Sequence, residues 1–123
     1  MNKIGILVFS VLLAAPGVVS ARDHVERYYQ DIWCDNVGGE TEYILPDRTR
    51  VDCLTDEHAI EFDFADKWAE AIGQSLYYAS QTGRKPGIVL IMERPKNELR
   101  YVERVFNALN AFGLDVDLWF ATR

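Results

Sequence analysis

The six residues from Gly87 to Met92 form an unbroken apolar run, which constrains the fold more than any other feature of the sequence. A strand that is apolar at every position is covered on both faces, as happens in sheets that carry helices on each side. Amphipathic patterns before and after the run predict those helices, at Ala65–Ser80 and Asn97–Asn110. The sequence therefore predicts an α/β protein in which helices flank a mixed sheet.

The remaining predicted elements are one helix and four strands. A helix is expected first, at Arg22–Cys34, and the last strand is expected at Asp115–Ala121. Between the first two helices lie three strand candidates joined by short turns, at Thr41–Leu45, Thr49–Leu54 and Ala59–Phe64. Connections this short imply antiparallel neighbours. The predicted order is helix, three strands, helix, strand, helix, strand.

The first 21 residues are predicted to be a signal peptide. A positive segment, Met1–Lys3, precedes the apolar run Ile4–Ala15, and small residues follow at Ser20 and Ala21. The run is too short to span a bilayer comfortably. We therefore expect one exported domain at residues 22–123, periplasmic or secreted, with no stable membrane association after cleavage.

The two cysteines, Cys34 and Cys53, are expected to form a disulfide, because such a pair is usually bridged in an oxidising compartment. Closing a loop of this size would stabilise the fold by about 3 kcal/mol. A zinc site is the alternative, but His24 and His58 complete no recognisable ligand spacing.

The chain is acidic, with a formal net charge of −6 that becomes −7 when Lys3 is removed with the leader. This charge argues against a protein that coats nucleic acid through many Lys and Arg contacts to phosphate. The negative charge is compatible with an enzyme that binds phosphate through a metal ion at one local site.

Carboxylates occupy unusual positions in two neighbouring strand candidates. Asp52 lies within the second strand, and Glu61 shares one face of the third strand with Asp63. Glu61 stands among apolar neighbours, where a carboxylate is costly unless something binds it. Asp52 and Glu61 could meet across the strands, and their repulsion would favour a divalent cation between them.

The second predicted helix carries a stripe of residues that share one side of the helix. At 100° per residue, Lys67, Ala71, Gln74 and Tyr78 fall on one side of the helix. A Lys near a helix start is poorly placed for the macrodipole, which favours anions there. Its position is better explained if the ammonium group faces the carboxylates just upstream.

These residues resemble the PD-(D/E)xK nuclease superfamily. The step of nine residues from Asp52 to Glu61, followed by a helix, is similar to its central motif, and Gln74 with Tyr78 resembles the Gln-x-x-x-Tyr motif of its RecB-like branch. The resemblance runs from about Val25 to Phe120. It implies a restriction-endonuclease-like αβββαβ core, followed here by a further helix and strand.

The resemblance also implies roles for individual residues. Asp52 and Glu61 would hold Mg²⁺ or Mn²⁺, a Lys would position or activate water, and a phosphodiester bond in nucleic acid would be cut. An acid on the first helix often assists, and Glu26 matches that place, while Glu42 on the first strand competes for the role. A homodimer is a candidate arrangement, because a nuclease this small often needs a partner to surround its substrate.

One residue departs from the family pattern. The third motif is usually Glu-x-Lys, and here it reads Glu61-Phe62-Asp63, so an acid replaces the Lys. Lys67, one helical turn further on, could send its ammonium group back into the site. Asp63 would then be a further metal ligand or would orient Lys67.

Each feature also has a simpler interpretation. Asp52 could be solvated at a strand edge or paired with Arg50, and Glu61 could form a structural salt bridge with Lys67. The turn at Asp56, Glu57 and His58 is expected to be solvated, and the aromatic residues expected in the core are Trp68, Tyr77, Phe106 and Trp119. The predicted function is an exported metal-dependent nuclease, and the alternative is a catalytically silent nuclease fold that serves as an extracytoplasmic binding module.

Overall fold

The computed structural model describes residues 21–122, so all of the predicted signal peptide except Ala21 lies outside the described residues. Three α-helices, five strands and one short 3-10 helix make up this part of the chain. In chain order they are α1 (Glu26–Asn36), β1 (Glu40–Ile44), β2 (Arg50–Leu54), β3 (His58–Phe64), η1 (Ala65–Lys67), α2 (Trp68–Thr82), β4 (Lys85–Ile91), α3 (Pro95–Ala111) and β5 (Asp117–Ala121). Within these residues no helix combines the length and the apolar character that crossing a membrane requires.

The five strands form one mixed sheet in the order β1-β2-β3-β4-β5, which confirms the α/β class. β1, β2 and β3 are antiparallel neighbours, whereas β4 runs parallel to both β3 and β5. Helices α2 and α3 make the two parallel crossovers, which hairpin turns could not make. The apolar run predicted as a central strand is β4, and it is buried from Gly87 onward.

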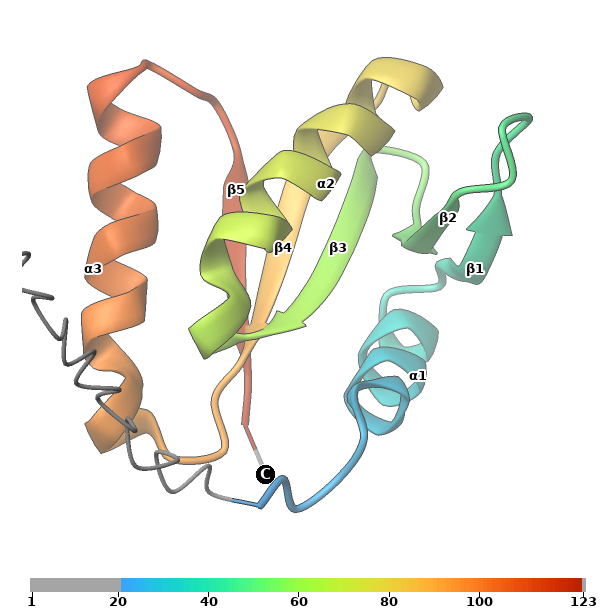
Figure 1. The fold of residues 1–123 in the computed structure, drawn as a ribbon. Coiled ribbons are helices and arrows are strands. Elements are labelled where there is room, and N and C mark those ends of the chain that lie inside the picture. The colour runs from blue at the N-terminus through green and yellow to red at the C-terminus, as the bar shows by residue number, and fades with distance from the viewer. Residues whose placement is uncertain (1–20, 123) are drawn as a thin grey trace, which may run out of the picture.

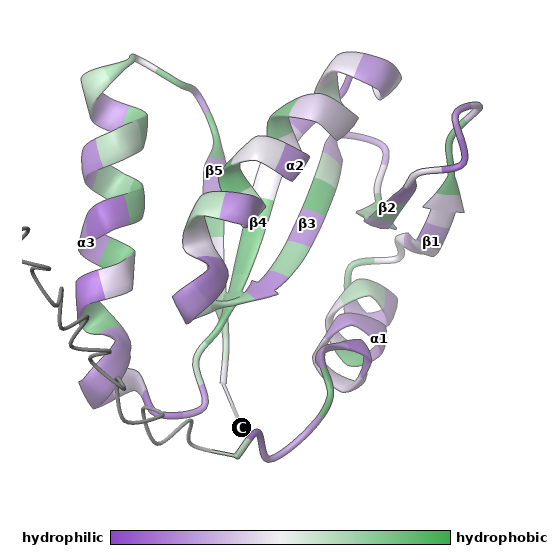
Figure 2. Cartoon of the chain, in the orientation of Figure 1, coloured by the Kyte–Doolittle hydropathy of each residue, from purple (hydrophilic) through white to green (hydrophobic). Residues whose placement is uncertain are grey.

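Helices cover both faces of the sheet (Figure 1). On one face, α1 packs over an apolar cluster that includes Ile60, Phe62 and Phe64 of β3. On the other face, α2 and α3 pack over Ile88 and Leu90 of β4. Figure 2 shows hydrophobic and hydrophilic bands alternating along β3, as the period of two in a strand requires. The acids of β3 therefore point to the face opposite α1.

Particular residues explain where α2 ends and where α3 begins. α2 stops at Gly83, whose φ of 68° is the left-handed conformation that glycine adopts without strain. Pro95 opens α3, where its missing N–H leaves no hydrogen bond unmade. The predicted start of α1 at Arg22 is wrong, because this helix begins at Glu26.

The segment before α1 is held in place by a buried carboxylate instead. Glu93, just after β4, accepts hydrogen bonds from the backbone N–H groups of Asp23 and His24 and from the hydroxyl of Tyr29. Burial opposes ionisation of Glu93, but these donors together with Arg94 lower its pKa to about 2. The chain therefore enters α1 from an anchored, non-helical segment.

The expected disulfide is present and connects α1 to β2. Cys34 and Cys53 are fully buried, and their sulfur atoms are bonded at 2.09 Å. Gly39 passes so close that a Cβ atom there would lie 2.5 Å from the sulfur of Cys53. The bridge thus fixes α1 against the strand that carries Asp52.

Two of the four aromatic residues expected in the core are in fact exposed. Tyr77 is 40% exposed because its hydroxyl reaches outward to Asp47 in the β1–β2 turn, and Phe106 is 47% exposed. α3 buries only Val105 and Leu109, so its apolar stripe is wider than its contact with the sheet. The other two, Trp68 and Trp119, are partly buried against the core clusters.

Candidate functional site

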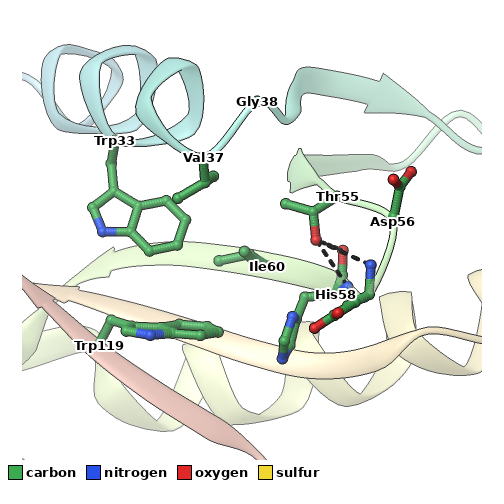
Figure 3. Close-up of a pocket in the computed structure, with 9 residues that line it drawn as sticks. Trp33, Val37, Gly38, Thr55, Asp56, His58, Ile60 and Trp119 are labelled. Atoms are coloured by element: carbon green, nitrogen blue, oxygen red, sulfur yellow. Dashed lines mark hydrogen bonds between the residues drawn. The ribbon is translucent and has the colours of Figure 1, made fainter.

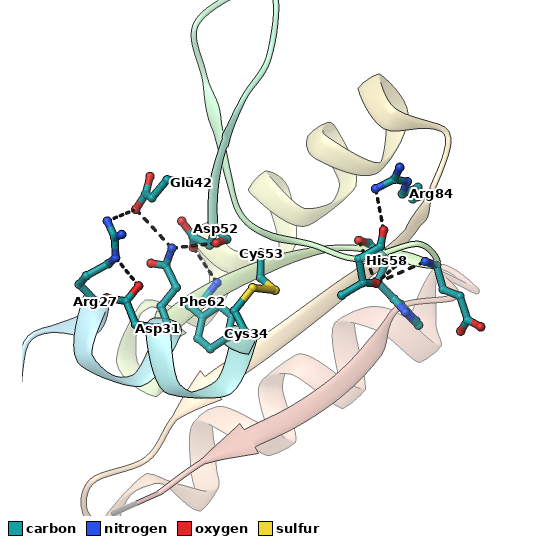
Figure 4. Close-up of a disulfide and its surroundings, with 12 residues drawn as sticks. Arg27, Asp31, Cys34, Glu42, Asp52, Cys53, His58, Phe62 and Arg84 are labelled. Atoms are coloured by element: carbon teal, nitrogen blue, oxygen red, sulfur yellow. Dashed lines mark hydrogen bonds and ion pairs between the residues drawn. A yellow bond between two sulfur atoms is a disulfide. The ribbon is translucent and has the colours of Figure 1, made fainter. Parts of the chain in front are cut away.

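β2 parts from β3 at Asp52, and this separation creates the candidate site. The two strands pair only through Cys53 and Leu54. One residue earlier, the Asp52 carboxylate accepts a hydrogen bond of 2.8 Å from the backbone N–H of Phe62 (Figure 4). The side chain therefore takes the place of a strand carbonyl. It is half-buried, and Arg50 lies near Glu42 (3.8 Å), so the solvated or Arg50-paired interpretation of Asp52 is wrong.

A glutamine that the sequence analysis did not single out supports Asp52 from the other side. Gln30 of α1 is buried, and its amide Nε2 donates to the backbone carbonyl of Asp52 at 2.8 Å and to the Glu42 carboxylate at 3.3 Å. The sequence could have indicated that Gln30 is buried, because it lies four residues before Cys34 and residues at this spacing share a helix face. A polar side chain on that buried face needed a partner.

Glu42 occupies a strained position directly across from Asp52. Its φ of 54° is uncommon for a residue with a side chain, and the β1–β2 ladder pairs the residues on either side of it. Its carboxylate lies 3.5 Å from Arg27 and 3.8 Å from Arg50. Glu42 thus lies near two cations, and it also raises the pKa of Asp52. Glu26 of α1 interacts electrostatically with Asp52 and Asp63, so both acids stay candidates for the assisting role.

Glu61 is the most unusual side chain in the described chain. It is 5% exposed, and its Oε2 atom is the one buried side-chain oxygen or nitrogen within residues 21–122 that has no hydrogen-bond partner. Burial raises the pKa of Glu61 well above its ordinary value, and both repulsion from Asp52 and hydrogen bonding with the Asp52 carboxylate add to the shift. Burial likewise raises the pKa of Asp52, although the Phe62 N–H and the hydrogen bond with Glu61 moderate this shift.

Two further acids, Glu26 and Asp63, interact electrostatically with this pair. Burial, followed by repulsion from Asp52 and Asp63, raises the pKa of Glu26 to about 7. Burial also raises the pKa of Asp63 to about 7, while the nearby Lys67 ammonium opposes the shift. Lys67 lowers the pKa of Glu26 as well, so this cation lies within range of acids from both α1 and β3.

Lys67 does not neutralise any of these acids by direct contact. It is exposed in η1, immediately before α2, and forms no ion pair with a described residue, so the structural Glu61–Lys67 salt bridge is absent here. Its side chain thus remains available to a ligand that reaches the carboxylates.

The two helix residues of the predicted motif differ in environment. Tyr78 is buried against Val51, Leu54 and Ala59, and burial, with smaller contributions from Glu61 and Asp52, raises its pKa to about 12. Gln74, one turn earlier, is exposed. Tyr78 therefore packs α2 onto the site, whereas Gln74 lies where a solvent-borne ligand could meet it.

Asp52 and Glu61 are the residues that could hold a magnesium-type cation, whose remaining coordination positions a ligand would fill. Within residues 21–122 no three His, Cys, Asp or Glu side chains converge into a ready-made metal cage. Mg²⁺ commonly uses one or two protein carboxylates and fills its remaining positions with water and substrate phosphate. Asp52 and Glu61 supply two carboxylates, and the unpartnered Glu61 Oε2 is an oxygen that a cation would satisfy.

Comparisons with known proteins do not assign the chain to a family. No family model matches it, and neither a curated protein nor a solved structure does. Any function must therefore be argued from the chain's own residues and their arrangement.

Proposed function

We propose that this protein is an exported metal-dependent nuclease that hydrolyses phosphodiester bonds of DNA or RNA. The observation that carries the proposal is the Glu61 carboxylate, which is buried beside Asp52 with one oxygen unpartnered. Two buried carboxyl groups that raise each other's pKa are costly to ionise side by side, whereas a divalent cation would stabilise both in the ionised form.

The order of the elements also supports the proposal. A helix, three antiparallel strands, a helix and a parallel strand are the order that the restriction-endonuclease-like core would have. In that arrangement Asp52 stands where β2 leaves β3, and Glu61 stands on the central strand β3. The disulfide and the predicted signal peptide are compatible with export.

In this proposal Asp52 and Glu61 hold Mg²⁺ or Mn²⁺. When bound, such an ion lowers the pKa of water and offsets negative charge on the phosphate. Lys67 lies within electrostatic range of the site and carries no ion pair with a described residue, so its ammonium group would stabilise the charge that develops on the phosphate oxygens.

The remaining candidates have supporting roles. Glu26 and Asp63 hold or release protons near neutral pH, because the pKa of each is raised to about 7. Either one could take the proton of the attacking water. Gln74, exposed on α2, would contact the substrate backbone or orient Lys67.

Cleavage assays on purified protein test the proposal. Plasmid DNA, single-stranded DNA and RNA would each be incubated with Mg²⁺, with Mn²⁺ or with a chelator. We expect cleavage that requires the metal and falls by at least about 100-fold in Asp52→Asn and Glu61→Gln. Glu103→Gln, an exposed acid on α3, is the matched control and should retain full activity. Full activity in both site variants would refute the proposal.

The alternative is a nuclease fold that binds without cutting. This alternative is favoured by Asp63, because the nuclease superfamily that the chain resembles usually has a Lys at that position. Calorimetric titration with Mn²⁺ separates the two functions. No Mn²⁺ binding above background, together with no cleavage of any of the three substrates, would favour the binding module.

A further inference from the structure

A cavity of about 350 Å³ lies away from the acidic site, on the face of the sheet that α1 covers. Its lining includes Ile60, the neighbour of Glu61 whose side chain points to the opposite face of β3. The other lining residues come from the end of α1, from the β2–β3 turn and from β5 (Figure 3). This volume is in the range of pockets that hold small organic ligands.

Two tryptophans form the inner part of the cavity. Trp33 of α1 and Trp119 of β5 both point into it, and their ring centroids are 5.4 Å apart with the planes tilted by 56°. Trp119 lies against the backbone of Gly87, where a Cβ atom would come within 2.7 Å of the indole ring. Trp33 packs edge-on against Phe62 at 5.5 Å. Both indoles are therefore held in place while part of each remains exposed.

The rim of the cavity is acidic. Asp56 and Glu57 are exposed in the β2–β3 turn, and neither forms an ion pair with any residue in the described part of the chain. Arg84 donates to the backbone carbonyl of Thr55 and lines an adjoining hollow, which shares Gly38, Thr55 and Asp56 with this cavity. It is not among the residues that line the cavity itself.

Two basic side chains near this cavity, His58 and Lys85, have acidic partners. His58, which was expected to be solvated, is instead half-buried and lies 2.6 Å from Asp117. Lys85 lies 3.0 Å from Asp117 and 3.2 Å from Asp115. No net positive charge remains there to attract a phosphate or a carboxylate, whereas the rim acids repel both.

We propose that this cavity binds a small organic cation, an ammonium group with an apolar body. The indole rings would attract the cation through their electron-rich faces, Ile60 and Val37 would cover its apolar part, and Asp56 with Glu57 would supply negative charge at the mouth. A quaternary amine in solution and a methylated lysine side chain of a peptide carry the same chemistry. The proposal is independent of the nuclease function, since it uses none of the acidic-site residues.

The three tryptophans of the chain give a direct readout. In a ¹H–¹⁵N spectrum, titration with choline should shift the indole N–H signals of Trp33 and Trp119 and leave that of Trp68, on the other face of the sheet, in place. We expect saturation with a Kd of about 1 mM, and binding about tenfold weaker for 3,3-dimethylbutanol, the uncharged analogue of the same shape. A capped peptide that contains trimethyl-lysine tests the second source. Tighter binding of the peptide than of choline would assign the site to a polypeptide ligand, and tighter binding of choline to a free amine.

The rim acids provide the controlled variant. Asp56→Asn combined with Glu57→Gln changes only exposed side chains, so the fold should persist, and the preference for choline over the uncharged analogue should fall to about twofold. Glu103→Gln removes an acid elsewhere and should preserve the preference. Equal affinity for choline and its uncharged analogue in the unmodified protein, or no saturable shift with either cation up to about 100 mM, would overturn the proposal.

Discussion

Replacing Glu61 with Gln should stabilise the metal-free protein at neutral pH, although it alters a buried polar residue. The Glu61 carboxyl is 5% exposed, repelled by Asp52 and without a partner for Oε2, so it holds a proton in the folded state far above its ordinary pKa of 4.5. The unfolded chain releases that proton above pH 4.5. The contribution of Glu61 to the free energy of unfolding is therefore fully present below pH 4.5 and is lost as the pH rises toward the folded-state pKa.

The size of the effect follows from the pH range. Each pH unit between the unfolded-state pKa and the working pH costs at most about 1.4 kcal/mol for one such group. From pH 4.5 to 7.5 the upper limit is about 4 kcal/mol, and relaxation of the site with entry of water should reduce it to about 2 kcal/mol. Gln cannot ionise and avoids this loss. The variant should thus melt about 10 °C above the unmodified protein at pH 7.5 and close to it at pH 4.5.

Thermal unfolding monitored by circular dichroism between pH 4.5 and 8, in the presence of a chelator, measures this difference. Glu103→Gln is the control, since it is the same substitution at an exposed position and should follow the unmodified protein at every pH. Adding Mn²⁺ at about 100 times its Kd should raise the stability of the unmodified protein by about 2.7 kcal/mol and leave Glu61→Gln unchanged. Parallel melting curves for Glu61→Gln and the unmodified protein across the whole pH range would refute the argument that Glu61 is buried at a cost.

Three further results are expected from the packing. Replacing both Cys34 and Cys53 with Ser should lower the free energy of unfolding by about 3 kcal/mol in a denaturant titration, and an unchanged midpoint would show that the bridge adds nothing. Gly87→Ala should cost about 1–3 kcal/mol in the same assay, because its Cβ atom would displace the Trp119 ring, and it should also shift the indole N–H signal of that residue. Glu93→Gln should weaken the hydrogen bonds that anchor the segment before α1 by about 1.5–3 kcal/mol, seen as faster hydrogen exchange at the two amides that donate to it. Exchange at the unmodified rate would argue against the anchor.

The sequence determined the elements of this protein and their order. The period of two along Ala59–Phe64 and the apolar run at Gly87–Met92 specify strands from neighbouring residues alone, and turn residues specify the short connections. The disulfide was also predictable, because the chain has only two cysteines and a predicted signal peptide. Glu61 stood out for the same local reason, as a carboxylate within an apolar strand.

The tertiary structure decided which side chains meet. Asp52 became part of a site because β2 leaves β3 there and exposes the Phe62 N–H, and Gln30 supports it from a helix more than 20 residues away in the sequence. Phe106 remained exposed although its helix position favoured burial, because a helix buries only the width that its neighbours cover, and Tyr77 remained exposed because its hydroxyl contacts Asp47. Periodicity is a property of adjacent residues, whereas strand separation and helix coverage depend on distant parts of the chain, so the sequence named the acids and only the fold showed which of them face one another.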